Sequence, residues 1–361
     1  MKFRMSLTFF LVTLLTGCSF LPSFVVNELN FIQGYGYDLT EKDNLEGTYV
    51  YPVFKGGKEP PKFETITGHG DTSKEVRQET NGKVRFPLVS GQIRLLLFGK
   101  SLAAKGIFPV VDTINRDPAI GTLSKMAIVD GKTKDLLLLK TQQNENMALY
   151  IQDLLEQNMT NGNIPHTDFN TFMYQYSKEG LDPYLPILKK EGDDLIISSI
   201  ALLKDDKIKT EIPKHYHFIF KNLVEKGNHG MQQFTMKNDD KVVIEIIHSK
   251  PKYRVQIHNG KPTFNIQLKI KARLQQYSST KPSPFPKIIN KITKQIEGQL
   301  EKQGRTIINK FKINDVDPLG LGSKYKAQDR KFRLKTWKED YPNAKVNLKV
   351  DVKLVQTGIL D

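Results

Sequence analysis

Apolar and polar residues alternate most regularly near the C-terminal end of the chain. From Phe264 to Leu274, apolar side chains occupy every second position. The positions between them hold Asn265, Gln267, Lys269, Lys271 and Arg273. Such alternation is typical of an antiparallel strand with one buried and one solvated face. We therefore expect Lys269, Lys271 and Arg273 to form an exposed cationic row, which either contacts a partner or is a solvated basic face that keeps the protein soluble.

The segments around this run have patterns that fit the same sheet. Alternation also predicts strands over 242–247, 253–258 and 346–354, with Asn259-Gly260 as a tight turn between two of them. Between the strands, residues 287–311 have an apolar stripe at helical spacing and many exposed lysines. A basic helix of this kind could lie on a membrane surface. Because strands flank it, packing against the sheet is the better interpretation.

The first two thirds of the chain have shorter patterns. We predict strands over 25–38 and 48–54, joined by a hairpin, and further strands over 92–98, 126–129, 195–203 and 217–221. Helices are predicted over 101–105 and from Met147 to Asn161-Gly162.

These elements indicate an α+β protein with three consecutive mixed α/β domains and largely antiparallel sheets. The expected divisions are a signal peptide over 1–17, an N-terminal α/β domain over 18–140, a middle domain over 141–210, either independent or partly inserted in the first, and a C-terminal domain over 211–361. In the C-terminal domain, a long basic amphipathic helix is expected to cover the sheet.

The first residues resemble a bacterial export signal. Lys2 and Arg4 precede an apolar run over 5–15, which is too short to span a bilayer, and Leu15-Thr16-Gly17-Cys18 follows. The tetrapeptide resembles a lipobox, in which Cys18 would accept diacylglycerol and further acylation, for example by palmitate. Two acyl chains are enough for stable anchoring. A buried free thiol after ordinary signal cleavage is the alternative for Cys18.

Composition and charge exclude several classes of protein. With 361 residues and 39% hydrophobic residues, the chain can form a folded core and is not a disordered protein. Its single cysteine excludes an intrachain disulfide bond. Residues 1–200 have a net charge of −2 and residues 201–361 a net charge of +17. A cationic half suits nucleic acid, an anionic membrane or a wall polymer. Because the signal indicates export, we expect no nucleic-acid partner.

Catalytic and cofactor motifs are incomplete. Gly99-Lys100-Ser101 and Gly131-Lys132-Thr133 lack the earlier glycine of a P-loop, and no nucleophile elbow or zinc-hydrolase motif occurs. His215 and His217 could chelate a metal with His69 or Asp71, but further ligands at a recognisable spacing are lacking. We predict no catalytic residues, no cofactor and no metal site.

Several separated segments together resemble the Ger(x)C family, the lipoprotein C subunits of spore germinant receptors. They follow the family's order at 27–32, 34–38, 97–107, 116–118, 127–131, 317–322 and 341–346, with Trp337 and Gly358. The residues that carry the motif are Asn27, Glu28, Leu29, Asp317, Pro318, Gly320, Gly322 and Trp337.

This resemblance implies a non-enzymatic lipoprotein at the outer face of the spore inner membrane. It would be attached to membrane lipid through Cys18 and would act with the membrane A subunit and the transporter-like B subunit of a germinant receptor. It assigns no small-molecule ligand to this chain. A solute-binding lipoprotein of an importer and a binder of anionic polymer or membrane remain as alternatives.

Overall fold

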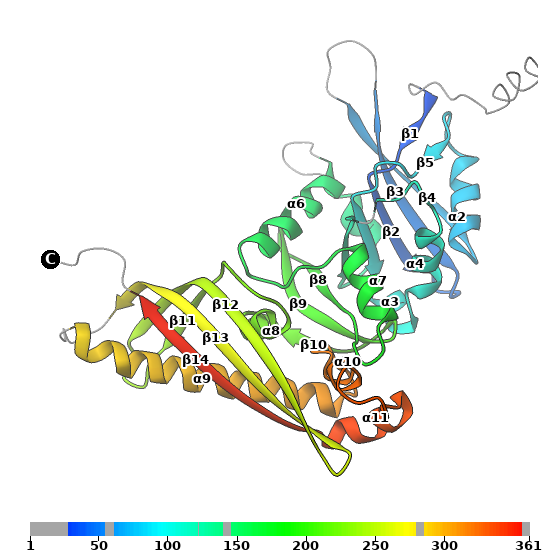
Figure 1. Ribbon diagram of the computed structural model, residues 1–361. Helices are drawn as coiled ribbons and strands as arrows, with labels where there is room; N and C mark the ends of the chain where they lie inside the picture. The colour runs from blue at the N-terminus through cyan, green and yellow to red at the C-terminus, as the bar shows by residue number, and fades with distance from the viewer. Residues whose placement is uncertain (1–27, 55–60, 122, 140–145, 279–284, 356–361) are drawn as a thin grey trace, which may run out of the picture.

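The computed structural model describes residues 28–54, 61–121, 123–139, 146–278 and 285–355. Figure 1 shows an N-terminal part, coloured blue to green, beside an elongated C-terminal part of long strands and one long helix. The mixture of helices and sheets and the helix-covered C-terminal sheet confirm the predicted α+β class.

The N-terminal part is built on one sheet, which has eight strands among the described residues. From edge to edge these are β10 (Lys207–Pro213), β9 (Asp194–Lys204), β8 (Tyr184–Glu191), β7 (Lys125–Val129), β6 (Leu95–Gly99), β2 (Gly34–Leu39), β3 (Leu45–Val53) and β4 (Lys62–Gly70). The pairs β2–β6, β6–β7 and β7–β8 are parallel, and the outer pairs are antiparallel. A short parallel pair, β1 (Asn30–Phe31) and β5 (Leu88–Val89), lies apart from this sheet.

This sheet crosses the boundary that the sequence places between the first and middle domains. β7 belongs to the segment 18–140 and β8 to the segment 141–210, yet Ile128 pairs with Ile187. A boundary at residue 140 therefore does not separate two sheets. Local patterns could not reveal this, because the pairing joins strands that are far apart along the chain.

Helices cover both faces of the eight-stranded sheet. One face packs against α2 (Ser73–Asn81), α3 (Lys100–Lys105), α4 (Phe108–Asn115) and α7 (Phe169–Ser177). The other face packs against α5 (Thr133–Leu137) and α6 (Met147–Thr160). Helix α8 (His217–Val224) lies between the two parts, since it contacts β12 (Lys241–His258) and α9 (Phe285–Ile313) and its Phe220 also packs against Tyr184 of β8. The core beneath the second group continues into the C-terminal part, so the two parts share buried apolar contacts.

The C-terminal sheet has the strand order β11 (Met231–Thr235), β12 (Lys241–His258), β13 (Lys261–Ser278) and β14 (Lys345–Val355). The two strands predicted over 242–258 are one continuous strand, β12. Pro251 interrupts the sequence pattern there. Its missing N–H is tolerated because β11 pairs only with Lys241–Glu245, which leaves that side of β12 open at Pro251.

Helix α9 (Phe285–Ile313) covers one face of this sheet, as predicted. On the helix itself, the side chains of Ile292, Ile296 and Leu300 are buried in the core. The helix also protects the edge strand β14. Glu301 accepts a hydrogen bond from the Val350 N–H at 3.1 Å, and Glu297 accepts one from the Val352 N–H at 2.9 Å. Occupied N–H groups cannot pair with another chain.

The prediction of a strand over 217–221 is wrong, because these residues begin α8. Every residue from His217 to Leu223 is buried. A helix buried on all sides has no polar face, so its apolar run looks like that of a buried strand. The short turn Lys214–Tyr216 precedes it.

Candidate functional site

The segment after α9 joins the two parts of the molecule. Asp317 is 3% exposed, and its carboxylate accepts hydrogen bonds from the N–H groups of Leu321 at 2.9 Å and Gly322 at 2.8 Å. These residues begin α10 (Leu321–Lys326). The Asp317 N–H donates to the Asp182 carboxylate at 2.6 Å, and the Asp182 N–H donates to the Asp317 carbonyl at 3.0 Å. A reciprocal pair of bonds thus connects segments 135 residues apart.

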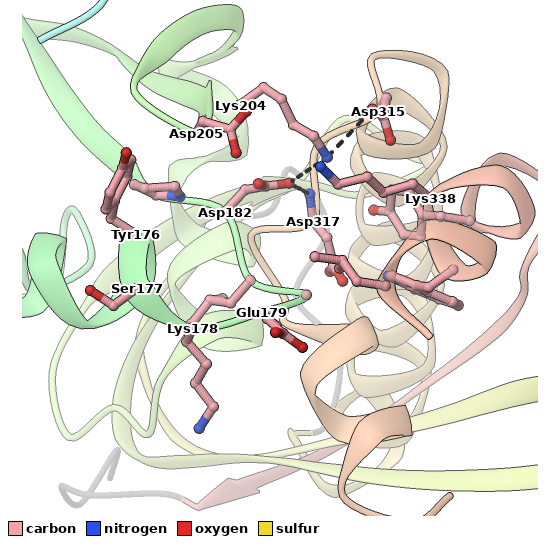
Figure 2. Close-up of a pocket in the computed structure, with 16 residues that line it drawn as sticks. Tyr176, Ser177, Lys178, Glu179, Asp182, Lys204, Asp205, Asp315, Asp317 and Lys338 are labelled. Carbon is pink, nitrogen blue, oxygen red and sulfur yellow. Dashed lines mark hydrogen bonds and ion pairs between the residues drawn. The ribbon is translucent and has the colours of Figure 1, made fainter. Parts of the chain in front are cut away.

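Charged side chains surround this connection (Figure 2). Lys204 reaches across from β9, with its Nζ 3.3 Å from an Asp182 oxygen and 3.4 Å from an Asp315 oxygen. The cavity beside them has a volume of about 140 Å³ and is also lined by Trp337, Lys338 and Tyr341. Its charges are therefore largely paired within the protein, which favours a structural role for this junction.

Burial changes the protonation of the junction. It raises the pKa of Asp317 to about 7, although the Gly322 and Leu321 N–H groups oppose the shift. Burial also raises the pKa of Asp182 against the opposing effect of Lys204. For Lys204, burial lowers the pKa, but Asp182 and Asp315 raise it by more. Near neutral pH the Asp317 carboxyl is therefore partly protonated.

Close backbone packing explains the glycines of this motif. A Cβ on Gly322 would lie 2.2 Å from the Trp337 Nε1 and 2.9 Å from the Gly180 Cα. The Ser323 N–H donates to the Gly180 carbonyl at 3.0 Å. Gly320 has a φ of 63°, in the left-handed region, and Pro318 beside it is buried.

The structure thus places Asp317, Pro318, Gly320, Gly322 and Trp337 together at the junction. Trp337, on α11 (Leu334–Asp340), packs against Tyr341 and Phe264 with ring centroids 5.2 Å and 5.6 Å apart. Sequence reasoning missed Gly180, Asp182 and Lys204. Nothing nearby in the sequence links them to Asp317, because their partner lies more than 100 residues away.

The segment Gly34–Asp38, which also carries the family resemblance, makes contacts on both faces of β2. Gly34 and Gly36 lie close to α6 and α5, since Cβ atoms there would lie 2.6 Å from the Ala148 Cβ and 2.3 Å from the Thr133 Oγ1. Asp38 accepts bonds from the Thr133 N–H at 2.9 Å and from its hydroxyl at 2.7 Å. Tyr35 and Tyr37 belong to the core on the opposite face of the sheet.

The face of the C-terminal sheet opposite α9 is cationic, and we call it the open face. On β13, Lys269 and Lys271 are exposed and Arg273 is partly exposed. Register places lysines beside these residues on both neighbouring strands: Lys250 pairs with Lys269, and Lys353 pairs with Lys271. Further outward-facing cations on these strands include Lys252, Arg254, Lys345 and Lys349.

Two acids lie among the cations of the open face. Glu245 is 3.3 Å from Arg273, and Asp351 is 3.2 Å from Lys349. Like charges directly opposite one another destabilise a sheet. The pair Lys271–Lys353 is therefore unfavourable for stability, whereas Lys269 lies between Lys250 and the opposite charge of Asp351.

The histidines considered for a metal site are not brought together. His69 lies on β4, where its Nε2 is 2.9 Å from Glu46, while His215 and His217 follow β10 at the opposite edge of the sheet. His217 lies within hydrogen-bonding distance of the Ile212 carbonyl, and burial lowers its pKa to about 4. Among the described residues, no group of three or more His, Cys, Asp or Glu side chains could hold a metal ion.

The N-terminal candidates lie at the start of the described chain or before it. Cys18 and Asn27 are outside the described residues. Glu28 is exposed, and Leu29 is partly buried beside β1. Within the described ranges, no helix has the length and apolar character that crossing a membrane requires.

Two family models together match nearly the whole chain. Residues 23–190 match the "Spore germination protein N-terminal domain", and residues 198–358 match "Spore germination B3/ GerAC like, C-terminal". A solved structure, titled the crystal structure of the GerBC protein, has the same fold, with a TM-score of 0.58 and 17% identity over 93% of this chain and 99% of that one.

Curated relatives agree with the family models. Spore germination protein B3 of Bacillus subtilis (strain 168) is 22% identical over 369 residues, which cover 98% of each chain. Spore germination protein GerQC of Bacillus cereus is 31% identical over 360 residues, or 99% of each chain. With this full-length relative and both family models matched, the chain belongs to the Ger(x)C family of spore germination proteins.

Proposed function

We propose that this chain is a non-enzymatic, lipid-anchored C subunit of a germinant receptor. It would be held by Cys18 at the outer face of the spore inner membrane, in a complex with the A and B membrane subunits. The match to GerQC over 99% of both chains carries this proposal. The lipobox at Leu15–Cys18 supports the anchor.

The chain's part in the complex is docking. A lipid anchor restricts a protein to the membrane surface and so raises its effective concentration near membrane partners. The open face, with Lys269, Lys271 and Arg273 at its centre, offers an anionic partner a broad cationic surface. Electrostatic complementarity of this kind sets orientation and association rate more than it sets affinity. We therefore assign the open face to contact with acidic segments of the membrane subunits.

Affinity capture from detergent-solubilised spore membranes tests the proposal. A C-terminally tagged chain should co-purify an A-type and a B-type membrane subunit, and a Cys18→Ala variant should recover clearly less of both. Deletion of the gene should abolish one nutrient-specific germination response without affecting spore formation. Recovery of importer subunits, or normal responses to every nutrient, would contradict the proposal.

The importer alternative does not fit the architecture. Such solute-binding proteins are usually built from two similar, mainly parallel α/β lobes, whereas the two sheets here differ in strand number, order and covering. The anionic-polymer alternative rests on the same open face as the docking proposal. Capture of the chain by acidic wall polymer or acidic lipid, without membrane subunits, would favour it.

A further inference from the structure

A cavity of about 320 Å³ lies on the face of the eight-stranded sheet that carries α2 and α4. Tyr35 and Tyr37 from β2 line it from the sheet. Its other lining residues come from α2, from the end of α4 and from the segment after α4: Ser73, Lys74, Arg77, Thr113, Ile114, Arg116, Asp117, Pro118 and Ile120. Two segments of the family resemblance, 34–38 and 116–118, therefore meet at this cavity, and the docking role proposed above uses neither.

The position of Arg77 in this cavity is fixed by its hydrogen bonds. Its guanidinium donates to the Ser90 hydroxyl at 2.5 Å and to the Leu88 carbonyl at 3.0 Å. The Ser90 hydroxyl is in turn 3.0 Å from the Tyr35 hydroxyl. An arginine fork that is already ordered loses little side-chain entropy when it binds an anion.

The charges around the cavity favour a single negative charge. Three cations, Lys74, Arg77 and Arg116, line it together with one acid, Asp117, and Arg116 is already paired with Asp112 at 2.9 Å, which leaves about one uncompensated positive charge. Asp117 is 3.4 Å from the Arg77 Nη1, and both side chains are 31% exposed. Nη1 and Nη2 both already donate to protein oxygens, so a second carboxylate would meet Arg77 through the N–H groups on the 31% of its side chain that is exposed. A doubly charged phosphate would meet stronger repulsion from Asp117 than a monoanion would.

The remaining walls suit a small apolar body. Pro118 supplies exposed aliphatic surface, while Ile114 and the edge-to-face pair Tyr35–Tyr37, with ring centroids 5.9 Å apart, are each 3% exposed and form an apolar floor. Small-molecule sites usually combine such apolar walls with a few convergent polar groups. We propose that this cavity binds a small monocarboxylate with a flat apolar body, whose carboxylate pairs with Arg77 and whose body rests on Tyr35 and Tyr37.

Calorimetry on the full-length protein in detergent tests this inference, with sodium benzoate as the probe and benzamide as its uncharged isostere at the same ionic strength. Benzoate should bind saturably, and benzamide at least tenfold more weakly. Arg77→Gln should weaken benzoate binding at least tenfold. No saturable benzoate binding, or equal binding of the two compounds, would overturn the inference.

Two further variants keep the test decisive if loss of Arg77 disturbs folding. Lys74 is exposed, so Lys74→Gln should preserve the fold and weaken benzoate binding severalfold. Ile120→Trp should fill the cavity and abolish binding without changing any charge. Lys294→Gln, at an exposed position on α9, is the matched control and should bind benzoate normally. Unchanged binding in both cavity variants would contradict the assignment, whatever the outcome of the docking experiments.

Discussion

The two large sheets of this protein are covered differently. In the eight-stranded sheet, every residue of β6 and β7 is buried, because helices pack on both faces. In the C-terminal sheet, buried and more exposed residues alternate along much of β13, because α9 packs on one face. The first sheet is thus a scaffold whose outer surface is made of helices and loops. The second presents a sheet face directly, and that face is cationic.

Alanine substitutions should show this difference most strongly. Leu96 and Leu97 point to opposite faces of β6 and are both 0% exposed, so each Leu→Ala change should cost about 2 to 5 kcal/mol of unfolding free energy. On β13, Ile270→Ala should cost a similar amount, but Lys271→Ala should change stability by no more than about 0.5 kcal/mol. Chemical denaturation measures all four, and a large loss with Lys271→Ala would contradict a solvated open face.

The Asp317 junction holds the two sheets together, and pH should modulate it. Each oxygen of the Asp317 carboxylate accepts one backbone N–H, and Asp317→Asn replaces one of these oxygens by an NH2 group that cannot accept. The substitution should therefore cost about 1 to 3 kcal/mol of unfolding free energy. The pKa of Asp317 is about 7 in the folded state and near 4 in the unfolded state. Between about pH 4 and pH 7, the native state therefore binds a proton at Asp317 that the unfolded state does not bind. The contribution of Asp317 to stability is therefore complete below about pH 4 and is lost as the pH rises through 7.

Denaturation of wild type and Asp317→Asn at pH 5 and pH 8 checks this sign. The cost of the substitution should be larger at pH 5 than at pH 8. Asp315→Asn is a useful control, since Asp315 also contacts Lys204 but is half exposed. A cost that increases with pH would contradict the effect of burial on Asp317.

The contact between α9 and the edge strand β14 should make a modest contribution to the stability of the C-terminal sheet. Glu301→Ala removes the acceptor of the Val350 N–H on β14 and should cost about 1 kcal/mol. It should also increase self-association, because the exposed N–H can pair with another chain. Denaturation and light scattering measure the two effects. Lys302→Ala, at the exposed neighbouring position, should produce neither.

The smallest expected effect is a gain in stability on the open face. Lys271 lies beside Lys353 in the strand register, so Lys271→Gln should stabilise the fold by about 0.2 to 0.5 kcal/mol at low salt. The gain should shrink in high salt, since solvent-exposed charges are screened. Thermal denaturation at two ionic strengths measures it. A loss of stability would indicate that Lys271 has a favourable partner.

The sequence was most informative where one face is buried and one is solvated. There, alternation located β13, its outward lysines and the stripe of α9 correctly. It failed for α8, whose residues are buried on every side, and it could not show that β7 pairs with β8 across residue 140, because that pairing is non-local. At the junction, the sequence marked Asp317 and Gly322 through the resemblance, but it could not reveal Asp182 or Lys204. Tertiary contacts alone bring those partners together.

Charge reversal on the open face tests the proposal that this face docks the membrane subunits. Lys269→Glu/Lys271→Glu is compared with Lys294→Glu/Lys302→Glu, which makes the same charge change at exposed positions on α9. Each tagged variant is captured from solubilised spore membranes, and the recovered A and B subunits are quantified. If the open face docks the membrane subunits, recovery should fall at least tenfold for the open-face variant and stay near normal for the α9 variant. Equal recovery of the membrane subunits by the two variants would contradict it.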